Sequence, residues 1–152
     1  VWCVFFFLSI RLPPRSTQSR SSAASDVYKI QISDHPNICI VMNEPSLRRY
    51  ASTVRRGGLL IVNSSLINQK YQNPDIQVLE VPGNEIAGKE VGDPRTLNMV
   101  VLGALLGYYS LVKDESIRQA LEEILLGKKS GLIDINMKAF YAGKNSIPKK
   151  NL

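Results

Sequence analysis

Hydrophobic residues fall into short runs between residues 27 and 81, and turn-forming or polar residues separate these runs. Continuous apolar stretches at Ile38–Met42 and Leu59–Val62 predict buried strands, and the alternation at Val27–Ser33 is typical of a half-buried strand. Ile76–Val81 predicts a further strand and Leu47–Val54 a helix. This order predicts an α/β fold, a Rossmann-like three-layer sandwich in which right-handed crossovers place helices on both faces of a mainly parallel sheet.

A helix that is apolar on nearly every side is predicted from Leu97 to Val112. Asp93 is its predicted cap, and Pro94 occupies the first helical position, where a missing N–H is tolerated. The apolar run is shorter than the roughly 20 residues that a membrane-spanning helix needs, so we expect a helix of the protein core. Gly103 and Gly107 lie one turn apart, and we expect them to let a neighbouring backbone come close.

Three more helices are predicted. Asn84–Val91 has the length and composition of a short helix. An amphipathic helix is predicted to start at the cap Asp114 and to end at Gly127, with an apolar face formed by Ile117, Ala120, Leu121, Ile124 and Leu125. The last helix is predicted near Leu132–Ala142 and directs Ile133, Met137 and Phe140 to the core. We interpret the last two helices as packing elements.

Polar and small residues follow the predicted strands directly. Asn43 follows one strand, Ser64 and Ser65 follow the next, and Gly83-Asn84 follow the third. In parallel sheets, ligands and partners collect at the carboxyl ends of the strands. Ordinary strand-to-helix turns use the same residue types, so both interpretations stay open.

Two residues near the start of the apolar helix extend this candidate site. Arg95 lies where it can face a phosphate or a partner carboxylate, although a surface or capping role is an alternative. Asn98 is the polar exception in the apolar stretch. The candidate ligand or interface contacts are therefore Asn43, Ser64, Ser65, Arg95 and Asn98.

Composition and charge narrow the function classes. The chain has 152 residues, of which 44% are hydrophobic, so we expect one domain with a substantial core. Half of the net charge of +6 comes from residues 1–30. The later pairs Arg48-Arg49, Arg55-Arg56, Lys128-Lys129 and Lys149-Lys150 are not clustered and have no interleaved aromatic residues, so we expect no nucleic-acid partner. Cys3 and Cys39 lack the spacing of a metal or cluster site.

The chain alone shows no catalytic constellation. It contains neither G-x-G-x-x-G nor G-x-x-x-x-G-K-[ST], so nucleotide binding of these types has no support. His35, the single histidine, precedes a proline in a predicted turn and has no positioned nucleophile partner. Ser64-Ser65 does not lie in a G-x-S-x-G elbow, and we expect no catalytic residue and no metal site in this chain.

The start of the chain has several interpretations. The first ten residues, V-W-C-V-F-F-F-L-S-I, suit the centre of a signal peptide, but no basic segment precedes them. A buried strand, or translation outside the true reading frame, explains them as well. We divide the chain into residues 1–25, an apolar run and Pro/Ser/Arg-rich linker, residues 26–144, the folded domain, and residues 145–152, a polar and loose tail.

Five segments in order carry a family resemblance: V-M-N-E-P-S-L-R-R-Y, G-G-L-L-I-V-N-S-S-L-I, V-P-G-N-E-I-A, D-P-R-T-L-N-M-V-V-L-G-A-L-L and L-I-D-I-N-M-K-A-F-Y-A-G. Through them, residues 37–144 resemble the gamma chain, or gamma-type domain, of the 2-oxoacid:ferredoxin oxidoreductases, which include the pyruvate and ketoisovalerate oxidoreductases. The resemblance implies a Rossmann-like, non-catalytic subunit that contributes to assembly and to the positioning of coenzyme A.

The resemblance also implies partners and cofactors. The complex decarboxylates a 2-oxoacid such as pyruvate, forms an acyl-CoA and reduces ferredoxin. Thiamine diphosphate and magnesium lie between alpha and beta chains in this family, and [4Fe-4S] clusters lie on the beta chain, a delta chain or a fused domain. We therefore expect alpha, beta and delta partners, ferredoxin as acceptor, no membrane partner and a cytoplasmic location.

The front of the chain departs from the family pattern. Gamma chains open with a strand and a turn resembling G-x-G-G-Q-G, whereas no glycine precedes Gly57 here. We expect the first βα unit to be missing or altered, which leaves an unpaired sheet edge. Two other functions stay open: a stand-alone Rossmann-like ligand-binding module, and a degenerate truncated gene product.

Overall fold

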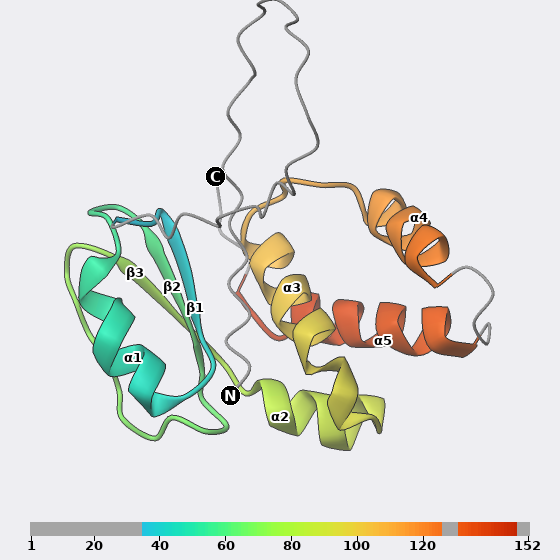
Figure 1. Cartoon of the computed structure of the whole chain (residues 1–152), viewed down its shortest axis with the longest axis horizontal. Coiled ribbons are helices and arrows are strands. Elements are labelled where there is room, and N and C mark those ends of the chain that lie inside the picture. The colour runs from blue at the N-terminus through green and yellow to red at the C-terminus, as the bar shows by residue number, and fades with distance from the viewer. Residues whose placement is uncertain (1–34, 126–130, 149–152) are drawn as a thin grey trace, which may run out of the picture.

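Three parallel strands form the sheet at the centre of the fold (Figure 1). The computed structural model describes residues 35–125 and 131–148. The strands are β1 (Ile38–Val41), β2 (Leu59–Asn63) and β3 (Gln77–Val81), with β2 in the middle, and they confirm three of the predicted strands. The predicted strand at 27–33 and the run at 1–25 lie outside the described residues.

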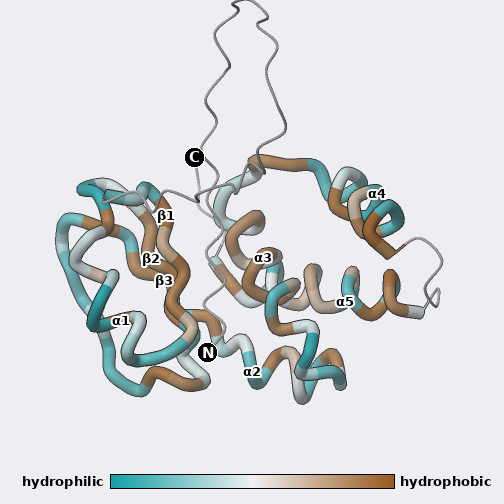
Figure 2. The backbone as a smooth tube through the Cα atoms, viewed as in Figure 1, coloured by the Kyte–Doolittle hydropathy of each residue, from teal (hydrophilic) through white to brown (hydrophobic). Residues whose placement is uncertain are grey.

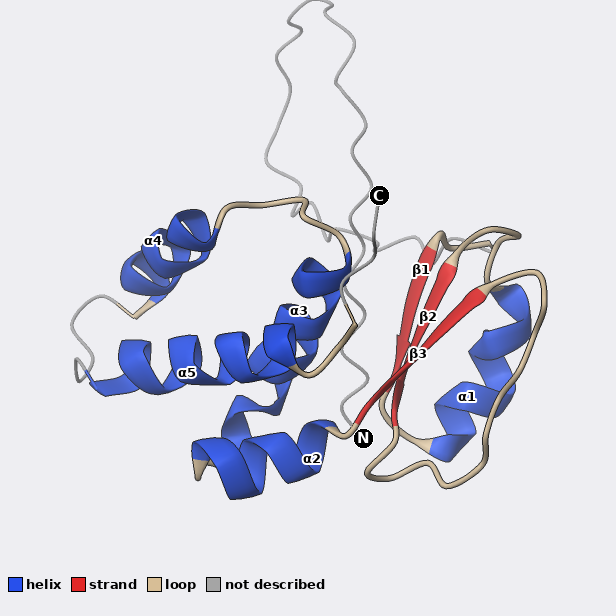
Figure 3. Ribbon diagram, turned by 180° about the vertical axis from the view of Figure 1, so that it is seen from behind, coloured by secondary structure: helices blue, strands red, loops and turns tan. Residues whose placement is uncertain are grey.

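Helices cover both faces of this sheet (Figure 3). On one face lie α1 (Glu44–Tyr50) and the short 3-10 turn Ala51–Thr53, and on the other lie α3 (Leu97–Tyr108) and α5 (Gly131–Asn145). All five residues of β2 are buried, and alternate side chains enter the two cores. The predicted three-layer α/β class is therefore confirmed.

A broken helical segment connects the sheet to α3. After β3 the chain forms α2 (Gly83–Glu85), which continues as the π-helix Ile86–Val91. This segment ends at Gly92, whose φ of 88° is a left-handed conformation that glycine adopts without steric cost. Asp93 then caps the 3-10 turn Pro94–Thr96 by accepting a hydrogen bond from the Arg95 N–H at 3.0 Å. Asp93 and Pro94 therefore have the predicted capping and first-position roles, but in the 3-10 turn that leads into α3, whose own N-cap is Thr96.

Helices α3 and α5 cross with their backbones in contact. A Cβ atom added to Gly103 would lie 2.0 Å from the Phe140 carbonyl oxygen, and one added to Gly143 would lie 1.9 Å from the Val100 carbonyl oxygen. At Gly107 the added atom would lie 2.8 Å from the Lys144 carbonyl oxygen. The predicted role of Gly103 and Gly107 is confirmed, and Gly143 does the same from the other helix.

The ends of two helices differ from the prediction. Helix α3 ends at Tyr108, because Tyr109 turns to an extended conformation, and Leu111 and Val112 are 53% and 43% exposed rather than buried. Helix α5 continues through Gly143 to Asn145, and Ile147 beyond it is buried against Gly107. The described start of the predicted loose tail is therefore helical and then packed.

Helix α4 (Asp114–Ile124) contributes less to the core than predicted. Asp114 is its first helical residue rather than its cap, and its carboxylate accepts hydrogen bonds from Lys144 Nζ at 2.6 and 2.8 Å instead of capping α4. Ile117 and Leu121 pack on the core, but no residue of α4 is fully buried and Ile124 is 72% exposed. Figure 2 shows the mixed polarity of this helix. The predicted end at Gly127 lies outside the described residues.

Candidate functional site

The carboxyl ends of the three strands meet around one buried side chain, Asn63, which ends β2 and is 2% exposed. Its Oδ1 accepts a hydrogen bond from the Gly83 N–H at 3.2 Å, after β3. Its Nδ2 donates to the Met42 carbonyl at 3.5 Å, after β1, and to Asn84 Oδ1 at 2.8 Å. One side chain therefore connects the ends of all three strands, at the edge where β3 leads into α2 (Figure 1).

Three of the predicted contacts lie at this edge. Asn43 caps α1, because its Oδ1 accepts a hydrogen bond from the Ser46 N–H at 2.9 Å. The Ser64 N–H donates to the Val81 carbonyl at 2.9 Å, and Ser65 Oγ accepts from the Glu85 N–H at 3.2 Å. The structure brings these residues together by turn and cap chemistry, and the half-buried side chains of Ser64 and Ser65 stay partly accessible.

Arg95 lies in the 3-10 turn before α3, and Asn98 lies in the first turn of α3. Both are close to the same edge of the sheet, since Leu97 between them contacts Gly83. The Arg95 guanidinium binds the Asp93 carboxylate through Nε at 2.9 Å and Nη2 at 2.8 Å. These side-chain hydrogen bonds lower the pKa of the Asp93 carboxyl below its ordinary 3.8 and raise the pKa of Arg95. Asn98 is exposed, and neither residue hydrogen-bonds to the Asn63 group in the described structure.

Asn63 itself was not among the predicted contacts. In the sequence, Asn63 directly follows four apolar residues in L-L-I-V-N. An asparagine at such a position can be either an ordinary turn residue or a buried residue that connects the strand ends. The distinction depends on Gly83 and Met42, which are distant in sequence. Buried carboxamides are retained in proteins when their donors and acceptors are satisfied, as they are here.

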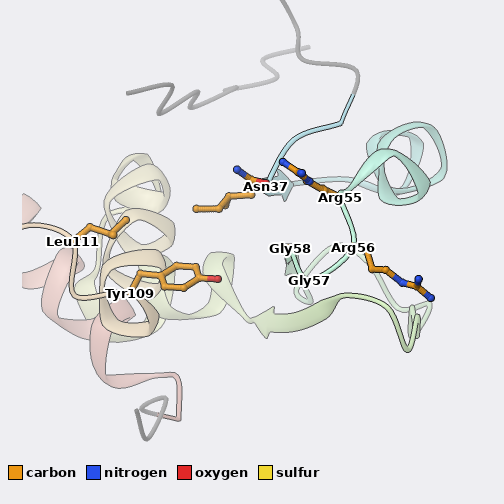
Figure 4. A pocket seen from close by; sticks show the side chains of 8 residues that line it. Asn37, Arg55, Arg56, Gly57, Gly58, Tyr109 and Leu111 are labelled. Atoms are coloured by element: carbon orange, nitrogen blue, oxygen red, sulfur yellow. The ribbon is translucent and has the colours of Figure 1, made fainter. Parts of the chain in front are cut away.

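An open pocket of about 530 Å³ lies at the opposite, amino edge of the sheet (Figure 4). Arg55, Arg56 and Tyr109 line it together with Asn37, Ile38, Gly57, Gly58 and Leu111. Arg56 is bound to Asp75 at 2.9 Å, and in Figure 4 its side chain extends away from Tyr109. None of the predicted contacts lines this pocket.

Hydrogen-bonding groups gather at the carboxyl edge of the sheet in the described structure. The edge carries carboxamides, hydroxyls and backbone N–H groups, together with the carboxylates of Glu44 and Glu85. His35 is exposed, and the described part of the chain holds no group of three His, Cys, Asp or Glu residues that could bind a metal ion. None of the described helices is long and apolar enough to cross a membrane.

Comparison with known protein families gives a match over nearly the whole chain. The family model for pyruvate ferredoxin/flavodoxin oxidoreductase matches residues 2–146. The chain belongs to the pyruvate ferredoxin/flavodoxin oxidoreductase family. The family predicted from the sequence is therefore confirmed.

Two relatives of this oxidoreductase-family chain illustrate its coverage. It is 36% identical over 122 residues to the ketoisovalerate oxidoreductase subunit VorA of Methanothermobacter marburgensis, covering 78% of this chain and 24% of that subunit. It is 31% identical over 133 residues to the 2-oxoglutarate synthase subunit KorC of Methanothermobacter thermautotrophicus, covering 78% of this chain and 69% of that subunit. The chain thus spans about a quarter of the length of the ketoisovalerate oxidoreductase subunits that it matches, 24% and 22%.

Solved structures share the fold of this oxidoreductase-family chain. The gamma subunit of a keto/oxoacid ferredoxin oxidoreductase from Geobacter sulfurreducens matches with a TM-score of 0.63 at 22% identity, covering 73% of this chain and 63% of that one. A 2-oxoglutarate:ferredoxin oxidoreductase from Magnetococcus marinus, with 2-oxoglutarate, coenzyme A and succinyl-CoA bound, matches with a TM-score of 0.63 at 17% identity, covering 76% and 21%. At these identities the likeness concerns the fold.

Proposed function

We propose that this chain is a non-catalytic, gamma-type subunit of a 2-oxoacid:ferredoxin oxidoreductase. The complex converts a 2-oxoacid such as pyruvate to an acyl-CoA and passes the electrons to ferredoxin. The family match over residues 2–146 carries the proposal. Relatives described as ketoisovalerate oxidoreductase and 2-oxoglutarate synthase subunits support it, as does the fold shared with a gamma subunit.

Within that complex, we propose that the chain contributes to assembly and to the positioning of coenzyme A. The carboxyl edge of the sheet supports this role because it gathers polar side chains around a fixed buried carboxamide. Ligands of open parallel sheets bind at this edge. The proposed contacts are Asn43, Ser64, Ser65, Arg95 and Asn98.

The cofactors of the complex do not fit the described residues of this chain. Thiamine-bound magnesium needs oxygen ligands and an iron–sulfur cluster needs cysteines, whereas the described part offers one cysteine, Cys39, and no group of potential metal ligands. We therefore propose that alpha and beta partner chains, with a delta chain or a fused domain, hold thiamine diphosphate, magnesium and the [4Fe-4S] clusters. A cytoplasmic location is proposed because low-potential clusters and ferredoxin belong in a reducing compartment.

Affinity purification of this chain from its own cells tests the proposal. We expect thiamine-dependent and cluster-bearing partners to co-purify, and the preparation to reduce a low-potential dye with a 2-oxoacid only when coenzyme A is added. Pyruvate, 2-oxoglutarate, 3-methyl-2-oxobutanoate and indolepyruvate, tested one at a time, identify the substrate. A soluble chain that purifies without partners and without this activity contradicts the proposal.

The contacts at the start of α3 are tested by Arg95→Ala and Asn98→Ala in the same complex. We expect weaker assembly or a higher KM for coenzyme A in at least one of these variants. Arg118→Ala and Asn145→Ala, at exposed positions on α4 and α5, are matched controls. If both site variants behave as these controls do, Arg95 and Asn98 are removed from the site.

A further inference from the structure

The orientation of the Asn63 carboxamide is fixed by two backbone groups. The Gly83 N–H can only donate, so the Asn63 atom 3.2 Å from it must be the oxygen. The Met42 carbonyl can only accept, so the atom 3.5 Å from it must be the nitrogen. With both ends assigned in this way, the exchange of oxygen and nitrogen that is often ambiguous for an asparagine is excluded on chemical grounds.

This orientation determines the orientation of a second carboxamide, that of Asn84. Asn63 Nδ2 is a donor, so the Asn84 atom 2.8 Å from it must be the acceptor Oδ1. The Asn84 amine then lies on the other side of its carboxamide, away from this hydrogen bond. Asn84 is exposed, and its amine donates to no other described residue. The carboxyl edge of the sheet therefore presents a hydrogen-bond donor to solvent at this point.

We propose that Asn84 Nδ2 recognises an acceptor oxygen of the ligand bound at this edge, and that Asn63 is the positioning residue that fixes the donor in that direction. This inference rests on the proposed function, in which coenzyme A binds at the edge. It adds the direction of the hydrogen bond. The Asn84 amine can bind a carbonyl, carboxylate or phosphate oxygen of the ligand, whereas a ligand group that only donates hydrogen bonds is disfavoured there.

The charges nearby favour an uncharged acceptor. Arg48 is bound to Glu44 at 2.5 Å, Lys89 to Glu85 at 3.4 Å and Arg95 to Asp93 at 2.8 Å, so each of these three cations already has a carboxylate partner. Cations that are already paired with carboxylates attract a bare anion less strongly. Amide carbonyls of the kind found in the pantetheine arm of coenzyme A fit such an edge better than its phosphates do.

The substitution Asn84→Asp tests the inference with little change of shape. An aspartate still accepts the hydrogen bond from Asn63 Nδ2, so the internal contact is kept, but its outward group is an acceptor instead of a donor. In the purified wild-type and variant complexes, we expect the KM for coenzyme A to rise about five- to tenfold, the loss typical of one hydrogen bond. The KM for the 2-oxoacid and the recovery of partner chains should stay unchanged.

Two further variants separate polarity from charge and size. Asn84→Ala removes the donor without adding charge and should raise the KM for coenzyme A less than Asn84→Asp. Asn145→Asp adds the same charge near the far end of α3, where Lys144 packs on Gly107, and should leave this KM unchanged. Competition by pantetheine and by adenosine 3′,5′-bisphosphate shows which part of coenzyme A provides the acceptor, and we expect Asn84→Asp to weaken pantetheine.

The variant Asn63→Asp tests the positioning role. Its carboxylate still accepts from the Gly83 N–H, but it has no donor for Asn84, so the Asn84 carboxamide must turn its amine inward and its oxygen outward. The KM for coenzyme A should therefore rise although Asn84 is unchanged, which a purely structural role does not predict for a complex that remains folded. If Asn63→Asp does not fold, Asn84→Asp and Asn84→Ala still decide the inference.

The outcomes are separable. The inference is overturned, and the proposed function left intact, if the wild-type complex is active and Asn84→Asp has the same KM for coenzyme A. The same holds if Asn84→Asp and Asn145→Asp change this KM equally. A wild-type complex without coenzyme A-dependent activity overturns both. A selective rise of the KM in Asn84→Asp, with weaker binding of pantetheine, supports the inference, whereas weaker binding of adenosine 3′,5′-bisphosphate alone contradicts the uncharged acceptor.

Discussion

Replacing Gly103 by alanine adds one methyl group at the point where α3 and α5 cross. The new Cβ would lie 2.0 Å from the Phe140 carbonyl oxygen, 2.9 Å from the Phe140 carbonyl carbon and 3.0 Å from the Lys144 nitrogen. All three neighbours are backbone atoms of one helix, so no side chain can rotate away. The two helices must separate until the shortest contact reaches about 3.4 Å.

The free energy of unfolding then changes through two opposing effects. Alanine is favoured over glycine in a helix interior by about 1 kcal/mol, which stabilises the variant. Separation of the helices loosens a region in which Val100, Ala104 and Phe140 are fully buried. Overpacking a dense core lowers the free energy of unfolding by up to about 3 kcal/mol, and we use this upper value because the contacts are with backbone atoms. We expect a net loss of about 2 kcal/mol, a substantial share of the 5 to 15 kcal/mol of a typical domain.

Urea unfolding followed by circular dichroism measures this change, and a thermal scan should show a midpoint lower by roughly 4 to 8 °C. Gly88→Ala is the matched control, because Gly88 lies in the π-helix Ile86–Val91 and a Cβ added there meets nothing within 4 Å. The control should be stabilised by about 0.5 kcal/mol. A Gly103→Ala protein as stable as the wild type, or as stable as the control, refutes backbone contact between α3 and α5.

Three other perturbations have defined outcomes. Asn63→Ala leaves the Gly83 N–H without its acceptor and should lower the free energy of unfolding by about 1 to 3 kcal/mol in the same urea assay, whereas an unchanged midpoint would count against its connecting role. Asp114→Asn weakens the ion pair with Lys144, whose side chains are 26% and 33% exposed, and should cost 1 kcal/mol or less, an effect that should shrink at high salt. An NMR titration should find the pKa of Asp93 below 3.8 in the wild type and closer to 3.8 in Arg95→Ala. Because folding depresses this pKa, the stabilisation is present above the unfolded-state pKa and is lost as the pH falls through the folded-state value, and equal pKa values in the two proteins would exclude the hydrogen bond as the cause.

The strands, the Asp93 cap and the glycine contacts of α3 could be predicted because each depends on local sequence. The buried strands read as apolar runs bounded by turn residues, and the cap depends on residues that are neighbours in the chain. Gly103 and Gly107 were informative because glycine in a helix interior needs a compensating contact. From the sequence, Gly143 could equally end the last helix or let a neighbouring backbone come close. Its contact with the Val100 carbonyl shows that it has the second role.

The features that were predicted wrongly or missed depend on residues distant in sequence. Asp114 suits a cap, but Lys144 lies close enough to bind its carboxylate. The apolar pattern continues through Leu111 and Val112, although the chain has already left α3. Within the candidate site, the polar residues at the strand ends could be located, whereas the donor direction at Asn84 follows from contacts made by Asn63 across 21 residues.

The central position of β2 also sets how the molecule opens. Its backbone pairs with β1 on one side and β3 on the other, and each of its five residues is buried. Amide hydrogens of β2 can therefore exchange with solvent only when both cores separate, whereas those of α4, which has no buried residue, are released by local fraying. The slowest hydrogen-exchange rates in β2 thus report the stability of the whole described fold, and the rates in α4 report the local opening of that helix.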